Sequence, residues 1–286
     1  ARLNNPMNTS PLNSAPLNSA PPAFIATAAD YSILEFDGYS LQSTEIISKD
    51  IKVDSTPNRE LIRFPTPRDH GGRIIGDYFR ERRIQVSGIV KSSTADALQT
   101  TLDTMKRRLS VGQANLDYKV NGAVRRIPAT LANPEQIFAQ REYYHITYCP
   151  FDLEFLALDP FFHDLEYTSY TNVGVTNLAY SNNVENLGTF KSQAVLVFII
   201  GSATSVTALE FSNNTNSQGI EVAAAFAAGD ILTIDGEERS VTLNGVEVDY
   251  NGIFPVFEYG TNSYTVNTTG TDIEYTMTAK FKQSYL

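Results

Sequence analysis

The stretch "GDILTIDGEERSVTLNGVEVDY" (residues 229–250) indicates the fold class of the second half of the chain. Apolar and polar residues alternate in it, which is the period of a strand with one buried face. Asp235-Gly236 and Asn244-Gly245 separate the alternating runs and are turn-forming pairs typical of hairpins. We therefore expect short antiparallel strands here, with core positions among Leu232, Ile234, Val241 and Leu243.

The alternation continues on both sides of this stretch. Further strands are expected at 191–200, 207–211, 220–224, 230–235, 239–243, 246–250, 263–267 and 272–281. In contrast, "TNVGVTNLAYSNNVENLGTF" (171–190) is rich in turn formers and predicts loops. About eight short strands with regular turns are typical of a β-sandwich or jelly roll.

The first half also has a mainly β pattern, from "YSILEF" (31–36) to a long strand at 143–155. "PTPRDHGGRIIGDYF" (65–79) is rich in Pro and Gly and predicts a long loop, whereas Asn121-Gly122 predicts a hairpin. Residues 94–110 predict the one helix, because Leu98, Leu102, Met105 and Leu109 recur at helical spacing. Ser93 is expected to cap its start and Gly112 to follow its end.

The length of 286 residues predicts more than one domain. Residues 1–30 are a Pro-, Asn- and Ser-rich arm in which "PLNSA" occurs twice in succession, at 11–15 and 16–20. Such a segment cannot pack on itself, so it is either a flexible leader or an arm that orders against a neighbouring protein. We place the domain boundary near residue 165, which gives a β-rich domain at 31–165 and a β-sandwich at 166–286.

The net charge of −10 is divided unevenly. Residues 49–145 carry 17 Lys and Arg against 11 Asp and Glu, whereas residues 146–286 carry 4 against 17. The basic charges are mixed with acids and form no dense block, so a protein contact surface is favoured over direct nucleic-acid binding. No apolar run is long enough for a membrane span, and we expect no secretory signal peptide.

No catalytic, cofactor or metal site is expected. The single cysteine, Cys149, lies in a strand-like run and is interpreted as a buried, inert thiol. His70, His145 and His163 show no metal-binding or catalytic spacing, and no phosphate-loop, nucleophile-elbow or dinucleotide motif occurs. Glu237 and Glu238 fall in a hairpin loop, where solvation explains them.

Glycan binding is a separate alternative, in which the chain would be a carbohydrate-binding adhesin or tail-fibre module that recognises a host surface glycan. Such sites need an aromatic platform, and the chain has no tryptophan. The residues that would form the platform are Tyr250, Phe257, Tyr259 and Tyr264.

Taken in order, these features resemble the distal tail proteins of long-tailed, siphovirus-type bacteriophages. The first half matches in its strands, "RRIQVSGIV", one amphipathic helix, the Asn-Gly hairpin and a long strand that closes in "LDPFF". The second half matches in "AAGDILTIDGEERSVTLNGVEVDY" (227–250) and "GIFPVFEYGTNSYTV" (252–266). The family's motif positions here are Asp230, Asp235, Asn244, Gly245, Pro255, Gly260 and Asn262.

The resemblance implies a ring-forming "belt" domain with one helix, followed by a galectin-like sandwich whose motif residues are structural. It also implies a structural protein of the virion tail tip, made in the host cytoplasm. A homo-hexameric ring would join the tail tube protein to the tail-tip hub protein, with the 65–79 segment reaching neighbours or the tube. The outer sandwiches would hold receptor-binding or side-fibre proteins.

Overall fold

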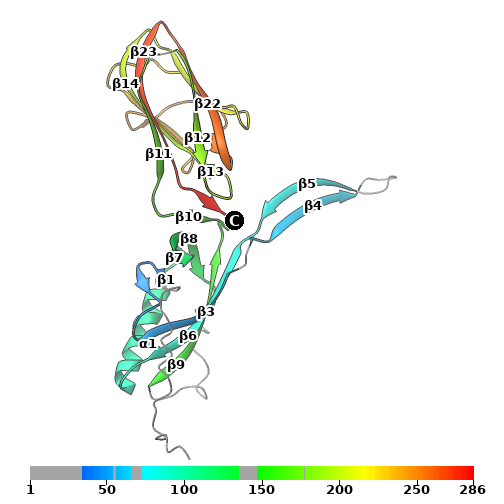
Figure 1. The fold of residues 1–286 in the computed structure, drawn as a ribbon, viewed down its shortest axis with the longest axis vertical. Coiled ribbons are helices and arrows are strands. Elements are labelled where there is room, and N and C mark those ends of the chain that lie inside the picture. Colours follow the sequence, from blue (N-terminus) through cyan, green and yellow to red (C-terminus); the bar gives the residue numbers. More distant parts are fainter. Residues whose placement is uncertain (1–33, 54–55, 66–71, 121, 135–146, 177) are drawn as a thin grey trace, which may run out of the picture.

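The computed structural model describes residues 34–53, 56–65, 72–120, 122–134, 147–176 and 178–286. Within them the fold is mainly β with a single helix, as expected. Two β-rich bodies lie end to end, and a long hairpin projects sideways from between them (Figure 1). The arm at 1–30, His70 and His145 lie outside the described residues.

The first body is built on a nine-stranded antiparallel sheet. Its strands are β1 (Leu34–Phe36), β2 (Tyr39–Ser40), β3 (Ile46–Val53), β6 (Arg82–Lys91), β7 (Ala114–Val120), β8 (Ala123–Leu131), β9 (Tyr148–Ala157), β10 (Phe162–Asp164) and β24 (Ser284–Tyr285). The main path runs β2-β1-β7-β8-β9-β6-β3, and β10 pairs with both β8 and β24. Cys149 lies in β9 and is buried, as interpreted from the sequence.

Helix α1 (Ala95–Leu109) contributes the predicted apolar face to the core of this body. Leu98, Leu102, Met105 and Leu109 are all buried. The N-cap is Thr94 rather than the expected Ser93, because the Thr94 Oγ1 accepts a hydrogen bond from the Ala97 backbone N–H at 3.2 Å. Gly112 has no positive φ, so it does not form the expected left-handed glycine cap.

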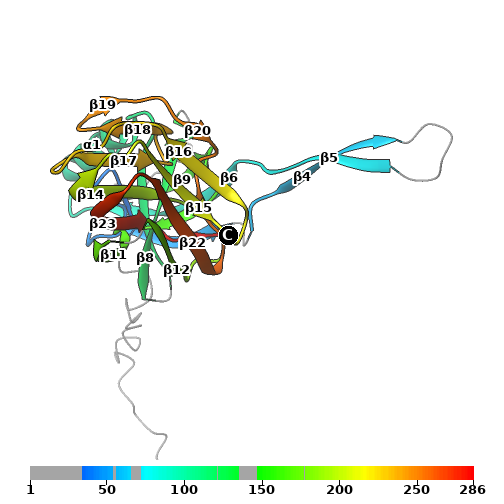
Figure 2. The same cartoon turned by 90° about the horizontal axis from the view of Figure 1, so that it is seen from above.

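The segment at 65–79 is not the long loop that the sequence predicts. Its second part forms strand β5 (Gly72–Phe79), which pairs with β4 (Arg59–Pro65) to make a separate two-stranded sheet. The hairpin extends well beyond the rest of the molecule when seen from above (Figure 2). The loop was predicted because the segment is rich in Pro and Gly. Gly76, however, lies inside the ladder, where it is paired with Ile62.

The second body is a sandwich of two main sheets. One consists of β11 (Thr168–Val175), β23 (Asp272–Phe281), β14 (Val195–Thr204), β17 (Ile231–Asp235), β18 (Ser240–Leu243) and β19 (Val246–Glu247), in that order. The other consists of β12 (Ala179–Asn186), β22 (Gly260–Thr269), β15 (Ala208–Asn213), β16 (Gln218–Val222) and β20 (Asn251–Gly252). A small ladder joins β13 (Ser192–Gln193) to β21 (Val256–Phe257).

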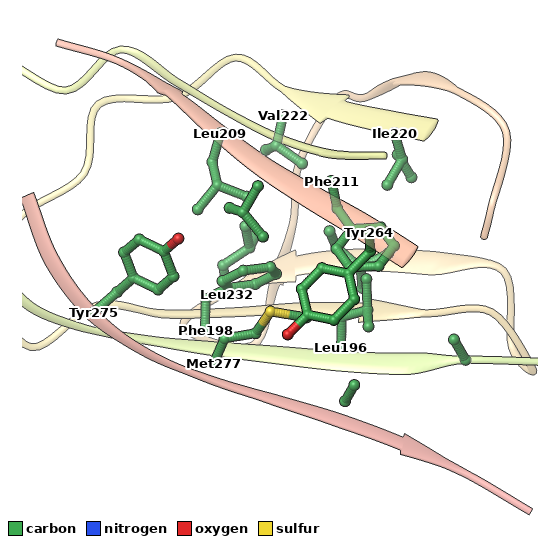
Figure 3. Close-up of a cluster of buried hydrophobic side chains, with 14 of the residues drawn as sticks. Leu196, Phe198, Leu209, Phe211, Ile220, Val222, Leu232, Tyr264, Tyr275 and Met277 are labelled. Atoms are coloured by element: carbon green, nitrogen blue, oxygen red, sulfur yellow. The ribbon is translucent and has the colours of Figure 1, made fainter. Parts of the chain in front are cut away.

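Side chains from the two main sheets meet in one continuous apolar core (Figure 3). Of the predicted core positions, Leu232, Ile234 and Val241 are buried, and Leu243 is partly buried against the same cluster. Leu232 and Leu243 are register partners, as are Ile234 and Val241. Alternation therefore predicted both the strands and their inward faces.

Residues 171–190 contain two sandwich strands where the sequence predicts loops. β11 pairs with β23 and β12 pairs with β22, so each is an outermost strand of its sheet. An edge strand exposes much of its surface, and polar residues such as Asn182 and Asn183 are tolerated there. Backbone pairing with a long neighbouring strand outweighs their weak intrinsic preference for strands.

The two hairpin signals of residues 229–250 give different turns. Asn244 and Gly245 have φ values of 53° and 78°, which form a two-residue turn between β18 and β19. Asp235 instead pairs with Ser240, so 236–239 is a four-residue loop. Gly236 is needed there because a Cβ at that position would lie 2.7 Å from the Ala194 carbonyl oxygen.

Alkaline pH is expected to destabilise the sandwich through its buried tyrosines. Burial raises the pKa of Tyr264 to about 12, and burial also raises the pKa of Tyr275. Each folded-state pKa exceeds the unfolded value of about 10, so the stability is complete below pH ~10 and is lost as pH rises through the folded pKa. For Tyr264 the loss approaches roughly 3 kcal/mol at the top of this window.

Urea unfolding followed by circular dichroism at increasing pH measures this effect. The double variant Tyr264→Phe/Tyr275→Phe keeps both rings and should flatten the alkaline fall in the free energy of unfolding. Tyr250→Phe, at a residue with 44% of its surface exposed, is the matched control and should leave the fall unchanged. An equal fall in the double variant and the control would contradict the assignment.

Candidate functional site

The β4–β5 hairpin is the most prominent surface feature of the chain, and we call it the hairpin arm (59–65 and 72–79). Large apolar side chains are exposed along it, namely Ile62 (44%), Phe64 (54%), Ile74 (60%), Ile75 (66%) and Tyr78 (45%). Clustered apolar side chains on a projecting ribbon indicate a surface that is buried in an assembly. Ile62 and Phe64 alternate along β4 and share one face, while Ile74 is paired with Arg63 on the other.

Charged pairs hold the hairpin arm in shape. Arg59 forms a bidentate pair with Asp77, and Glu60 pairs with Arg80 while accepting a hydrogen bond from the Tyr78 hydroxyl at 2.8 Å. The Arg59 guanidinium lowers the pKa of Asp77, and Arg80 with Tyr78 lowers that of Glu60. Both carboxylates are therefore ionised at neutral pH and brace the ladder while its apolar side chains stay exposed.

The junction between the two bodies is held together by residues 284–285. β24 adds to the nine-stranded sheet by pairing with β10, and the Arg125 guanidinium lies 3.6 Å above the centre of the Tyr285 ring. Ser284 also contacts the sandwich, because its carbonyl accepts a hydrogen bond from the Phe190 N–H and its N–H donates to the Ser192 hydroxyl. Residues 284–285 therefore join both bodies.

A cleft of about 520 Å³ lies at this junction. Its walls include Arg126, Asp159, Phe161, His163, Phe190 and Lys282. Most of its charges already have partners within the chain, since Arg126 makes two hydrogen bonds to Asp117 and His163 Nε2 lies 3.0 Å from Asp159 Oδ2. His163 Nδ1 lies 3.2 Å from Ser284 Oγ, so the histidine also connects β10 with β24. The arrangement is that of a polar contact between domains.

The motif positions of the sandwich clamp its turns. Asp230 accepts hydrogen bonds from the Ala227 N–H and the Asn244 amide, which together lower its pKa, and Asn244 Oδ1 accepts from the Ile231 N–H. Asp235 Oδ1 accepts hydrogen bonds from the backbone N–H groups of the two following loop residues, Glu237 and Glu238. All of these bonds close local loops.

Three buried asparagines, Asn186, Asn213 and Asn262, hydrogen-bond to the backbone of the segment that follows Pro255. The side chain of each is 0% exposed. Asn262 donates to the carbonyls of Glu258 and Gly260 and accepts from the Glu258 N–H. Gly260, with φ of 88°, makes the turn that Asn262 closes. Asn213 and Asn186 donate to the carbonyls of Val256 and Phe257, respectively.

The sandwich also matches a known family model. The model describes a siphovirus-type tail component, C-terminal domain, and it matches residues 188–285. Residues 188–285 of the sandwich are therefore similar to the C-terminal domain of siphovirus-type tail components. The resemblance indicated by the sequence motifs is thus confirmed.

One solved structure shares the fold of this chain over most of its length. SPP1 Dit, described as a paradigm of the hub adsorption apparatus in phages that infect Gram-positive bacteria, superposes with a TM-score of 0.67 at 15% identity. The match covers 88% of this chain and 98% of SPP1 Dit. A chain of the phage P2 baseplate in its activated conformation with Ca has a TM-score of 0.44 at 8% identity, over 86% of this chain and 92% of that one. No curated protein sequence matches the chain.

The glycan platform considered from the sequence is not assembled at the surface of the sandwich. Phe257 and Tyr264 are 0% and 1% exposed and belong to the sandwich core. Only Tyr250 and Tyr259 are exposed, at 44% and 71%, and the Tyr250 ring packs edge-on against Phe254. Strand alternation at 262–266 would have placed Tyr264 inward, since Asn262 and Val266 flank it on the same face.

The described part of the chain offers little else for chemistry. No group of three or more His, Cys, Asp or Glu side chains within it is placed to hold a metal ion. None of its helices is long and apolar enough to cross a membrane. Sequence reasoning missed the hairpin arm and β24, although "RELIRF" and "RIIGDYF" carry an apolar pattern that could have indicated paired strands.

Proposed function

We propose that the chain is a structural component of a phage tail tip and forms a closed ring of six copies there, joining the tail tube protein to the tail-tip hub protein. Residues 31–165 would build the ring, and the sandwich at 166–286 would face outward and hold receptor-binding or side-fibre proteins. The family match and the fold shared with SPP1 Dit support a place in the adsorption apparatus.

The observation that carries this proposal is the hairpin arm. A two-stranded ribbon is marginal in water on its own, and exposing several large apolar side chains makes it less favourable still. Such an arm is stabilised when it packs on another surface, and in a closed ring each copy offers that surface to the next. Closure also gives every copy the same contact, so no arm is left without a neighbour.

The proposal that the sandwich holds fibre or receptor-binding proteins is supported by its hydrogen-bonded loops and its edge strands. Its motif residues clamp loops rather than gather around a ligand, which suits a rigid scaffold. Two of the outermost strands of the sandwich, β11 and β12, pair with a strand on one side only, and such edges can accept a further strand from a partner protein. We propose these edges as the attachment positions for fibre or receptor-binding proteins.

Electron cryomicroscopy of the phage tail that carries this chain tests the proposal. We expect a six-fold ring at the tip, with density for the hairpin arm lying on the neighbouring copy. A three-fold arrangement, or copies that do not touch, would exclude the six-fold ring. Location of the chain away from the tip would exclude the role in joining tube and hub.

A further inference from the structure

Three phenylalanines from separate parts of the chain meet where the hairpin arm leaves the body. Phe79 ends β5, Phe161 lies between β9 and β10, and Phe190 belongs to the sandwich side of the junction. The rings of Phe161 and Phe190 stack with centroids 4.1 Å apart and an interplanar angle of 14°. The Phe79 ring meets both edge-on, at 5.5 Å and 80° and at 5.6 Å and 90°. We call these three residues the aromatic joint.

Two of the three rings are fixed by buried neighbours. Phe161 precedes Phe162, which is buried beneath the guanidinium of Arg82 at 4.9 Å from the ring centre. Phe190 donates its N–H to the Ser284 carbonyl and accepts at its own carbonyl from the buried Asn186 amide. The stacked rings of Phe161 and Phe190 therefore form a fixed packing surface for Phe79, with one ring contributed by each body.

The hairpin arm shares no ladder with the large sheet where it leaves the body. It forms a separate sheet, and Arg80 and Glu81 separate β5 from β6 of the large sheet. The backbone hydrogen bond at this point, from the Arg80 N–H to the Asn58 carbonyl at 2.8 Å, joins the two sides of the arm to each other. A short connection without a shared ladder lets a ribbon swing as a unit. The edge-to-face contacts of Phe79 oppose that motion, because they favour one geometry over others.

We propose that the aromatic joint sets the direction of the hairpin arm and couples it to the position of the sandwich. Phe79 is the positioning residue of the arm, and Phe190 passes any displacement of the sandwich to it. A partner that shifts the sandwich relative to the large sheet would displace Phe190 from its position beside Phe161. The packing surface for Phe79 would then change, and the hairpin arm would point in a different direction. By the reciprocity of linked equilibria, docking of the arm would also change how the sandwich binds its partner.

The distance between the hairpin arm and the sandwich within one full-length chain tests this proposal. The measurement does not require the copies to assemble into a closed ring. Spin labels at Arg63→Cys and Asn183→Cys, both exposed positions, are placed in a Cys149→Ala background for pulsed electron paramagnetic resonance. We expect one narrow distance distribution in this reference protein. Phe79→Ala should broaden it by about twofold or more, because the arm then samples several directions.

Further variants test whether these residues orient the hairpin arm or only stabilise the fold. Phe161→Ala and Phe190→Ala should broaden the distribution as Phe79→Ala does, whereas Phe79→Tyr retains the ring and should keep it narrow. Ile75→Ala is the matched control, since it removes a large side chain, 66% exposed, from the same strand. An unchanged width in Phe79→Ala, or equal broadening in Ile75→Ala, would overturn the proposal. Because the readout is within one chain, it does not depend on ring formation.

Discussion

Replacing Ile62 and Phe64 together by aspartate is expected to lower incorporation of the chain into tails by at least about 100-fold. Both side chains are exposed on one face of the hairpin arm, at 44% and 54%. Burial of two such side chains in an interface contributes roughly 3–6 kcal/mol, and aspartates there would also have to lose their hydration. The isolated chain should keep its thermal stability, because neither residue belongs to a core cluster.

Incorporation is measured by supplying each variant during infection by a phage that lacks the chain, then quantifying it in purified tails by mass spectrometry. The matched control is Val173→Asp with Leu187→Asp, which places two charges at exposed apolar positions of the sandwich, 78% and 64% exposed. We expect the control to enter tails normally. Normal incorporation of Ile62→Asp/Phe64→Asp would show that the hairpin arm does not contribute to the contacts between copies in the ring.

Asn262→Leu should lower the free energy of unfolding of the sandwich by about 4 kcal/mol. The Asn262 side chain is 0% exposed and makes four hydrogen bonds, of 2.7–3.1 Å, to Glu258, Gly260 and Asn213. Leucine has a similar volume but neither donates nor accepts, so the part-buried backbone groups of Glu258 and Gly260 lose their partners. Each such loss costs roughly 1–3 kcal/mol.

Urea unfolding followed by circular dichroism measures this difference. Asn183→Leu, at an exposed position of the neighbouring strand β12, is the matched control and should stay within about 0.5 kcal/mol of the parent. Hydrogen exchange adds the location, since the amides of the turn should lose protection before those of the first body. A loss below about 1 kcal/mol for Asn262→Leu would show that the turn finds other partners.

Elements with a strong period were predictable from the sequence. The helix at 95–109 and the inward positions of β17 and β18 follow from apolar spacing alone, because each face must reach a core. The Asn244-Gly245 turn was predictable because few residue pairs adopt two successive left-handed conformations. The hydrogen-bond partners of the motif residues were not visible in the sequence.

The edge strands β11 and β12 were mispredicted because their polar sequences favour turns by local preference. Each becomes a strand through pairing with a distant partner, which for β11 lies about a hundred residues away in β23. Long-range pairing of this kind leaves no signal within a short window of sequence. The hairpin arm was mispredicted for a different reason, because the Pro and Gly residues of 65–79 concealed a local apolar pattern.

The sequence by itself determined that the chain is a mainly β protein with one amphipathic helix, an acidic second half and no recognisable catalytic motif. These properties depend on local period, composition and turn chemistry, which act within a few residues. The tertiary structure alone decided that β24 crosses to the large sheet, that Phe257 is buried, and that Phe79, Phe161 and Phe190 meet. Such contacts arise from packing between residues far apart in the chain, where burial of apolar area and satisfaction of backbone hydrogen bonds are settled for the whole molecule together.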